Sequence, residues 1–127
     1  MELKDIQRLV ELSKYETETE KDTNEYNELY DRFIEMLKNN ELVINFTKVN
    51  GDERIMPCTR NNTYISRYYN GEKKETEQNE DDYKKNRDKA LVKVFDTEKK
   101  AFRSFHVYNL NSYSIRRDFK RLYKEVK

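Results

Sequence analysis

The chain has 127 residues, which is the length of a single domain. Charged residues make up 40% of it and hydrophobic residues 35%, so we expect a small core beneath a heavily solvated surface. An aromatic content of 13%, including ten tyrosines, argues against a generally disordered chain, because disordered chains lack such anchors. Two glycines and one proline leave few chain breaks, which favours regular elements.

The net charge of +1 conceals a gradient along the chain. Residues 1–40 hold six Lys/Arg and eleven Asp/Glu, a net charge of 6 − 11 = −5. Residues 99–127 hold nine Lys/Arg and two Asp/Glu, a net charge of 9 − 2 = +7. The basic end is suited to attract phosphate or an acidic protein surface. A solvated face rich in Lys and Arg is the alternative explanation.

Cysteine usage and hydropathy indicate the compartment. Cys58 is the single cysteine, so the chain forms no internal disulfide and no cysteine-based metal cluster. This usage is typical of a reducing compartment. The N-terminus lacks the pattern of a signal peptide, and no apolar run approaches the roughly 20 residues of a membrane helix. We therefore expect a soluble cytoplasmic protein without membrane contact.

The first 40 residues have helical periodicity. Leu3, Ile6 and Leu9 have helical spacing within residues 2–15. A second helix is predicted through residues 24–40, with Asp22 and Glu25 in the positions of a capping box. Its apolar stripe consists of Tyr26, Leu29, Tyr30, Phe33 and Leu37. We expect the two helices to form a hairpin.

From residue 41 the period changes to that of strands. The segment ELVINFTKV alternates apolar and polar residues, and Asn50-Gly51 is a strong hairpin signal before the return strand RIMPCTR. Pro57 lacks a backbone donor, which predicts an edge or a bulge. Residues 61–69 fit either a further strand or a short helix.

The second half of the chain begins with a highly charged segment. Residues 70–88 contain one aromatic and no aliphatic residue, which predicts a long exposed loop. The strands ALVKVFD and AFRSFHV follow, joined by the turn TEKK, with a short strand at NLNSYS. Phe102 and Phe105 are expected core anchors, and their three-residue spacing suggests a bulge. IRRDFKRLYKEV predicts a basic amphipathic helix with Ser114 as its N-cap.

These elements predict an α+β protein. We expect a helical hairpin appendage (1–40), a small antiparallel Sm-like or SH3-like β-barrel (41–114) with an exposed loop at 70–88, and a basic C-terminal helix (115–127). A flat sheet of four or five short strands leaves one face and both edges open. Curling into a barrel removes the edges and encloses a core.

Two stretches resemble a known family. INFTKVNGDERIMPCT (44–59) and VFDTEKKAFRSFHVYNL (94–110) are similar to the paired signatures of WYL_2, a phage-associated family with an Sm-like, SH3-type β-barrel related to WYL domains. In this chain Phe102 stands where the family often has Trp, and His106, Tyr108 and Asn109 stand where Arg, Asp and Arg are common. The resemblance implies the barrel fold and a bacteriophage or similar mobile-element origin. WYL relatives are associated with nucleic-acid or nucleotide ligands.

The sequence offers little support for catalysis. His106 has no second histidine to pair with, so a structural or surface-binding role is favoured over a catalytic one. Cys58 lies in an apolar strand pattern, typical of a small core residue. The carboxylates at 80–82 have lysine neighbours and no EF-hand spacing, which favours a solvated charge run. We therefore predict a non-enzymatic protein with no cofactor and no metal.

Binding is the better supported class of function. We expect a phage accessory protein in the cytoplasm of a host cell, acting as an interaction module that inhibits or adapts host or phage machinery. The alternative is a single-stranded RNA or DNA module, since cations and aromatics interleave along residues 60–69. Self-association through the N-terminal helices is also open. The predicted contact residues are Arg60, Arg67, Tyr68, Arg103, His106, Arg116, Arg117, Lys120 and Arg121.

Overall fold

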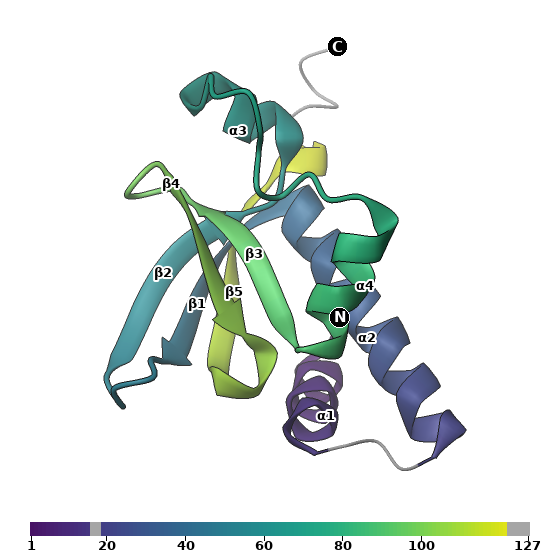
Figure 1. Cartoon of the computed structure of the whole chain (residues 1–127). Helices are drawn as coiled ribbons and strands as arrows, with labels where there is room; N and C mark the ends of the chain where they lie inside the picture. The colour runs from purple at the N-terminus through teal and green to yellow at the C-terminus, as the bar shows by residue number, and fades with distance from the viewer. Residues whose placement is uncertain (16–18, 122–127) are drawn as a thin grey trace.

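The computed structural model describes residues 1–15 and 19–121. It is an α+β fold in which helices cover a five-stranded antiparallel sheet (Figure 1). The elements in chain order are α1 (Leu3–Lys14), α2 (Glu20–Asn39), β1 (Asn40–Thr47), β2 (Glu53–Thr59), α3 (Asn62–Tyr68), α4 (Glu80–Asp88), β3 (Leu91–Asp96), β4 (Ala101–His106), the short 3-10 helix η1 (Val107–Asn109) and β5 (Leu110–Asp118). None of the helices described is long and apolar enough to cross a membrane.

Helices α1 and α2 lie against each other and against the sheet. Ion pairs join Asp5 to Arg32 at 3.7 Å and Arg8 to Glu25 at 2.9 Å. The N-cap of α2 is Thr19, whose hydroxyl accepts a hydrogen bond from the backbone N–H of Asp22. The cap therefore lies three residues before Asp22, the position predicted for it. The predicted hairpin connection includes residues 16–18, which lie outside the described residues.

The sheet has the order β4-β3-β2-β1-β5 and is not closed. β1 pairs with β2 and β5 along most of its length, whereas β2 and β3 pair only through Cys58 and Thr59. The predicted closure into a barrel is wrong in this respect, because the edge strands β4 and β5 do not pair within the described sheet. Helices α1 and α2 complete the core in place of that closure, since their apolar residues pack into the same cluster as those of the strands.

The sheet is packed on both of its faces. The larger cluster joins α1 and α2 to side chains such as Val94 and Phe105, while a smaller cluster contains Phe95 and Phe102 beneath α3. β3 and β4 pair in continuous register from Leu91–His106 to Asp96–Ala101, so the bulge predicted from the phenylalanine spacing is wrong. Phe102 and Phe105 are three residues apart because each packs on a different face.

The C-terminal segment differs from its prediction. Residues 115–118 continue β5, where Ser114 pairs with Val43 and Ile115 with Leu42, so Ser114 is not a helix N-cap. Pairing with the edge of β1 extends the strand through the apolar pattern that suggested a helix. A helical turn begins at Phe119, and the Asp118 carboxylate accepts a hydrogen bond from the backbone N–H of Arg121. The remainder of the predicted helix, residues 122–127, lies outside the described residues.

The charged segment at 70–88 is not loop throughout. Residues 80–88 form α4, capped by Asn79, whose side chain accepts a hydrogen bond from the backbone N–H of Asp82. Tyr83 fastens this helix to α2 through a hydrogen bond from its hydroxyl to Asp31 at 2.6 Å. Of the two alternatives for residues 61–69, the short helix is the one found, as α3.

Candidate functional site

A groove of about 500 Å³ opens between the β1–β2 hairpin and β4. We call it the β2–β4 groove. Its position follows from the short pairing of β2 with β3, which lets the hairpin and β4 diverge (Figure 1). Phe46, Met56 and Phe105 are buried side chains of the core that also line the groove, so its floor is apolar.

Cations line the groove from several elements. Lys48 comes from the β1–β2 turn, Arg54 from β2 and Arg103 from β4, and the imidazole of His106 lies beside them at the end of β4. No carboxylate belongs to the set of described residues that line it. An apolar floor with a cationic rim is suited to an anionic ligand that also carries apolar groups.

Two of these cations are held in place by hydrogen bonds. Arg54 Nη2 lies 3.0 Å from Asp96 Oδ2, and Asp96 is 1% exposed. Arg103 Nη1 donates to the carbonyl of Phe102 at 2.9 Å, which keeps the guanidinium beside the β4 backbone. These contacts preorganise the two guanidinium groups, which lowers the entropy lost when a ligand binds.

His106 lies at the end of β4 and lines the groove. Its Nδ1 is 3.0 Å from the carbonyl oxygen of Lys89. Since a carbonyl only accepts, Nδ1 carries the proton in this contact, and Nε2 is the ring nitrogen that remains for a ligand. The ring also stacks on Tyr108 with centroids 4.7 Å apart. His106 is therefore a surface-binding candidate with an oriented ring.

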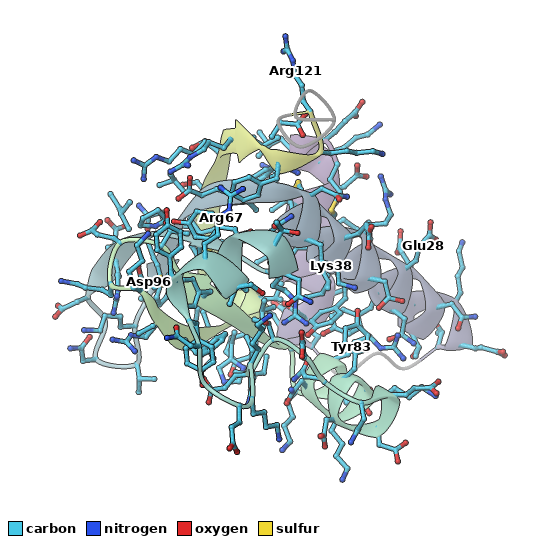
Figure 2. The ribbon with its side chains drawn as sticks, turned by 90° about the horizontal axis from the view of Figure 1, so that it is seen from above. Glu28, Lys38, Arg67, Tyr83, Asp96 and Arg121 are labelled. Carbon is cyan, nitrogen blue, oxygen red and sulfur yellow. The ribbon has the colours of Figure 1, made fainter. Side chains whose placement is uncertain are left out.

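A second cationic surface surrounds α3. Lys100 Nζ lies 3.8 Å from the ring centroid of Tyr68 and donates to the hydroxyl of Tyr64 at 2.7 Å. Tyr68 is 49% exposed, and its ring lies 4.9 Å from that of Tyr64. We call Tyr64, Tyr68 and Lys100 the α3 aromatic cluster. Arg67 belongs to the same helix and is exposed (Figure 2).

Arg116 and Arg117 lie at the end of β5 beside a buried carboxylate. Glu41 is fully buried, and its Oε1 lies 2.8 Å from Arg117 Nε. This contact is ionic without a directed hydrogen bond, because Glu41 Oε1 accepts none from the described residues. Glu41 Oε2 accepts a 2.5 Å hydrogen bond from the hydroxyl of Thr97 and lies 3.9 Å from Arg116 Nη1. Glu41 thus fixes both arginines at the surface.

Arg60 occupies a different environment from the other predicted contact residues. It is 6% exposed and donates to the carbonyls of Lys93 and Thr76 at 2.5 and 3.0 Å. Burial lowers the pKa of its guanidinium, and the nearby hydroxyls of Tyr30 and Tyr83 partly offset this effect. In this arrangement Arg60 fastens the segment before α4 to β3.

The predicted contact residues are therefore spread over several surfaces. The structure brings Arg103 and His106 together in the groove and places Arg67 and Tyr68 on α3. Lys120 and Arg121 are exposed beyond β5, and Figure 2 shows Arg121 projecting away from the body of the molecule.

The sequence analysis missed two cations of the groove, Lys48 and Arg54. The hairpin signal at Asn50-Gly51 contained the information to find them, because its register pairs Arg54 with Phe46. It also missed Glu41, for which no local pattern in the sequence gives a signal.

The fold is that of a small β-domain with helices packed on an antiparallel sheet. The family model described as WYL_2, Sm-like SH3 beta-barrel fold, matches residues 30–111, well over half of the chain. The chain belongs to this family. No curated protein matches it. No solved structure matches it either.

The described residues contain no cluster of three or more His, Cys, Asp or Glu side chains suited to a metal ion. Cys58 is fully buried, and burial raises the pKa of its thiol, with Asp96 and Glu41 adding to the effect. A thiol of this kind is a poor nucleophile. The groove and the α3 aromatic cluster are the candidate binding sites.

Proposed function

We propose that this protein is a non-enzymatic interaction module whose β2–β4 groove binds a segment of another protein. The observation that carries the proposal is the composition of the groove, an apolar floor with cations and no carboxylate among its described lining residues. Apolar area contributes affinity at such a surface, and complementary charge contributes selectivity and a faster association rate.

The biological setting belongs to the same proposal. The protein is a phage accessory protein in the cytoplasm of a host cell, where it inhibits or adapts host or phage machinery. The family resemblance, the small size and the absence of a catalytic pattern in the sequence support this setting. The apolar stripe of α2, considered above for self-association, is buried in the core. The groove, in contrast, is open at the surface and accessible to a partner.

The test is capture of a partner from host lysate, with and without nuclease. We expect one stoichiometric protein that survives nuclease and is lost with Lys48→Glu/Arg103→Glu. The matched control is Lys21→Glu/Lys84→Glu, which reverses two exposed charges on α2 and α4. Capture that is indifferent to the groove variant, or no captured protein, counts against the proposal.

A second candidate function, binding of single-stranded RNA or DNA, is favoured by the α3 aromatic cluster. Tyr68 is half exposed beside Lys100, and stacking on such rings is worth about 1–3 kcal/mol per base. Arg117 lies 5.9 Å from the ring of Tyr64 and adds positive charge. The acidic helices α1 and α2 oppose a large duplex footprint.

A salt titration tests this candidate with labelled oligonucleotides of mixed sequence. Binding through phosphates weakens steeply as salt rises, and Tyr68→Ala lowers the affinity further, whereas Tyr15→Ala, at a tyrosine that is 71% exposed elsewhere, does not. An absence of binding at low salt excludes the nucleic-acid function.

A further inference from the structure

β4 is an edge strand whose outer side faces the β2–β4 groove. It pairs with β3 along its full length of six residues, and no described strand pairs with its other side. Four consecutive residues, 103–106, line the groove, so the groove follows the backbone of the strand. Unpaired N–H and C=O groups on such an edge are a template for another strand.

β2, on the opposite wall, is the poorer template. It also has a stretch without a partner on one side, since its pairing with β3 is limited to Cys58 and Thr59. Pro57, next to Cys58, has no backbone N–H to donate, and its carbonyl already accepts from the backbone N–H of Thr97 at 3.0 Å. β4 contains no proline, so the residues whose backbone groups point away from β3 keep their N–H donors, although the Phe102 carbonyl already accepts from Arg103 Nη1.

The side chains around the groove select the kind of strand that fits. An extended peptide directs alternate side chains to opposite sides. One set shares the face of β4 that carries Arg103 and Phe105, beside the apolar floor, and the other shares the face of Ser104 and His106. The complementary segment combines apolar and acidic residues.

The same geometry argues against single-stranded nucleic acid in this groove. Bases need exposed ring faces for stacking. The two phenylalanines of the floor, Phe46 and Phe105, are 8% and 3% exposed, and Phe105 stacks on Phe46 with centroids 5.7 Å apart. Their ring faces are used within the core.

We infer that an extended, acidic peptide of a partner protein pairs with β4 as a sixth strand of the sheet. Main-chain hydrogen bonds to β4 supply affinity, and the cations of the groove select the peptide. The inference rests on the proposed function, because it specifies how the groove holds its partner.

The experiment uses the full chain and a fluorescein-labelled peptide of about eight residues alternating Glu and Val, long enough to cover β4. A peptide alternating Lys and Val is the charge control. We expect the Glu peptide to bind and the Lys peptide to bind at least roughly tenfold more weakly. Lys48→Glu/Arg103→Glu lowers the affinity for the Glu peptide about tenfold or more, whereas Lys21→Glu/Lys84→Glu leaves it unchanged.

Backbone pairing has its own readout. Alternate backbone N–H groups of the bound Glu peptide face β4. N-methylation of this set removes the donors and abolishes binding, whereas N-methylation of the other set is tolerated. Hydrogen exchange shows protection of amides in 103–106 when the peptide is bound. Equal effects of the two methylated sets, or equal binding of the Glu and Lys peptides, overturn the inference.

The two proposals fail in different ways. Capture of a host protein that depends on Lys48 and Arg103, without any binding of the Glu peptide, leaves the proposed function intact and overturns strand addition. A lysate in which no protein is captured, together with peptide-dependent protection of β4, supports strand addition and counts against the host partner.

Discussion

At the scale of single residues, Glu41 is a fully buried carboxylate that requires ionic and hydrogen-bond partners. A fully buried carboxylate is costly unless it is paired, and this one is met by Arg117, Thr97 and, more distantly, Arg116. It joins the start of β1 to the end of β5 and to the β3–β4 turn. The pairing of β1 and β5 is irregular next to it, between Glu41 and Leu42.

Arg117→Ala is predicted to lower the free energy of unfolding by about 2 kcal/mol, because it leaves the Glu41 carboxylate buried without its nearest cation. Arg116→Ala, whose guanidinium is 3.9 Å away, costs less than about 1 kcal/mol. Urea denaturation measures both variants. In a double-mutant cycle, Arg117→Ala lowers the free energy of unfolding less in the Glu41→Gln variant than in the unchanged protein, since the charge of Glu41 is already gone. Additive effects of the two substitutions contradict this account.

At the scale of elements, the β3–β4 hairpin depends on Asp96. One oxygen of this carboxylate accepts hydrogen bonds from the backbone N–H groups of Glu98 and Lys99, both at 2.9 Å, and the other pairs with Arg54. Lys100 completes the turn with a φ of 53°, the left-handed region that side chains other than glycine seldom adopt. Asp96 thus joins the turn to the wall of the groove.

Asp96→Ala is predicted to destabilise the protein by about 3 kcal/mol, because it frees two backbone donors and Arg54. Asp96→Asn keeps an acceptor for the turn and loses the charge, so about half of that loss is expected. Thermal and urea unfolding separate the two variants. Losses of the same size for both would show that the ion pair, and not the turn, dominates.

At the scale of the whole molecule, three tyrosines connect α2 to the second half of the chain. Tyr26 donates to the carbonyl of Arg87 and Tyr30 to that of Leu91, while Tyr83 of α4 donates to Asp31. Burial is the main cause that raises the pKa of each phenol, that of Tyr30 to about 12. Each must stay protonated to donate its hydrogen bond.

Stability is therefore predicted to fall between about pH 10 and 12. In this window the unfolded chain releases phenol protons, with an ordinary pKa of about 10, that the folded protein retains, so the free energy of unfolding decreases as pH rises. Tyr30→Phe costs about 1 kcal/mol at neutral pH by leaving the carbonyl of Leu91 unpaired, and it makes the alkaline loss less steep. Urea unfolding across this range measures the slope of the unfolding free energy against pH. An unaltered slope in Tyr30→Phe contradicts the contribution assigned to Tyr30.

Local pattern alone was enough for much of the fold. The apolar stripes of α1 and α2, the Asn50-Gly51 turn and the paired strands around residues 97–100 follow from periodicity and turn chemistry, which act over a few residues. Two of the failures have tertiary causes. Ile115 and Arg117 follow a helical pattern yet extend β5, because the edge of β1 offered hydrogen-bond partners. Phe102 and Phe105 suggested a bulge, whereas packing on both faces of the sheet explains their spacing.

By itself, then, the sequence determined most of the elements, the family signatures and the supply of cations near the basic end. Only the tertiary structure decided which of these side chains lie together. Arg103 and His106 share a groove with Lys48 and Arg54 because the β1–β2 hairpin and β4 diverge. Arg60, in contrast, is buried and donates to a backbone carbonyl. The physical reason is that turns and caps are satisfied by near neighbours, whereas a groove and a buried charge such as Glu41 depend on contacts between residues far apart in the chain.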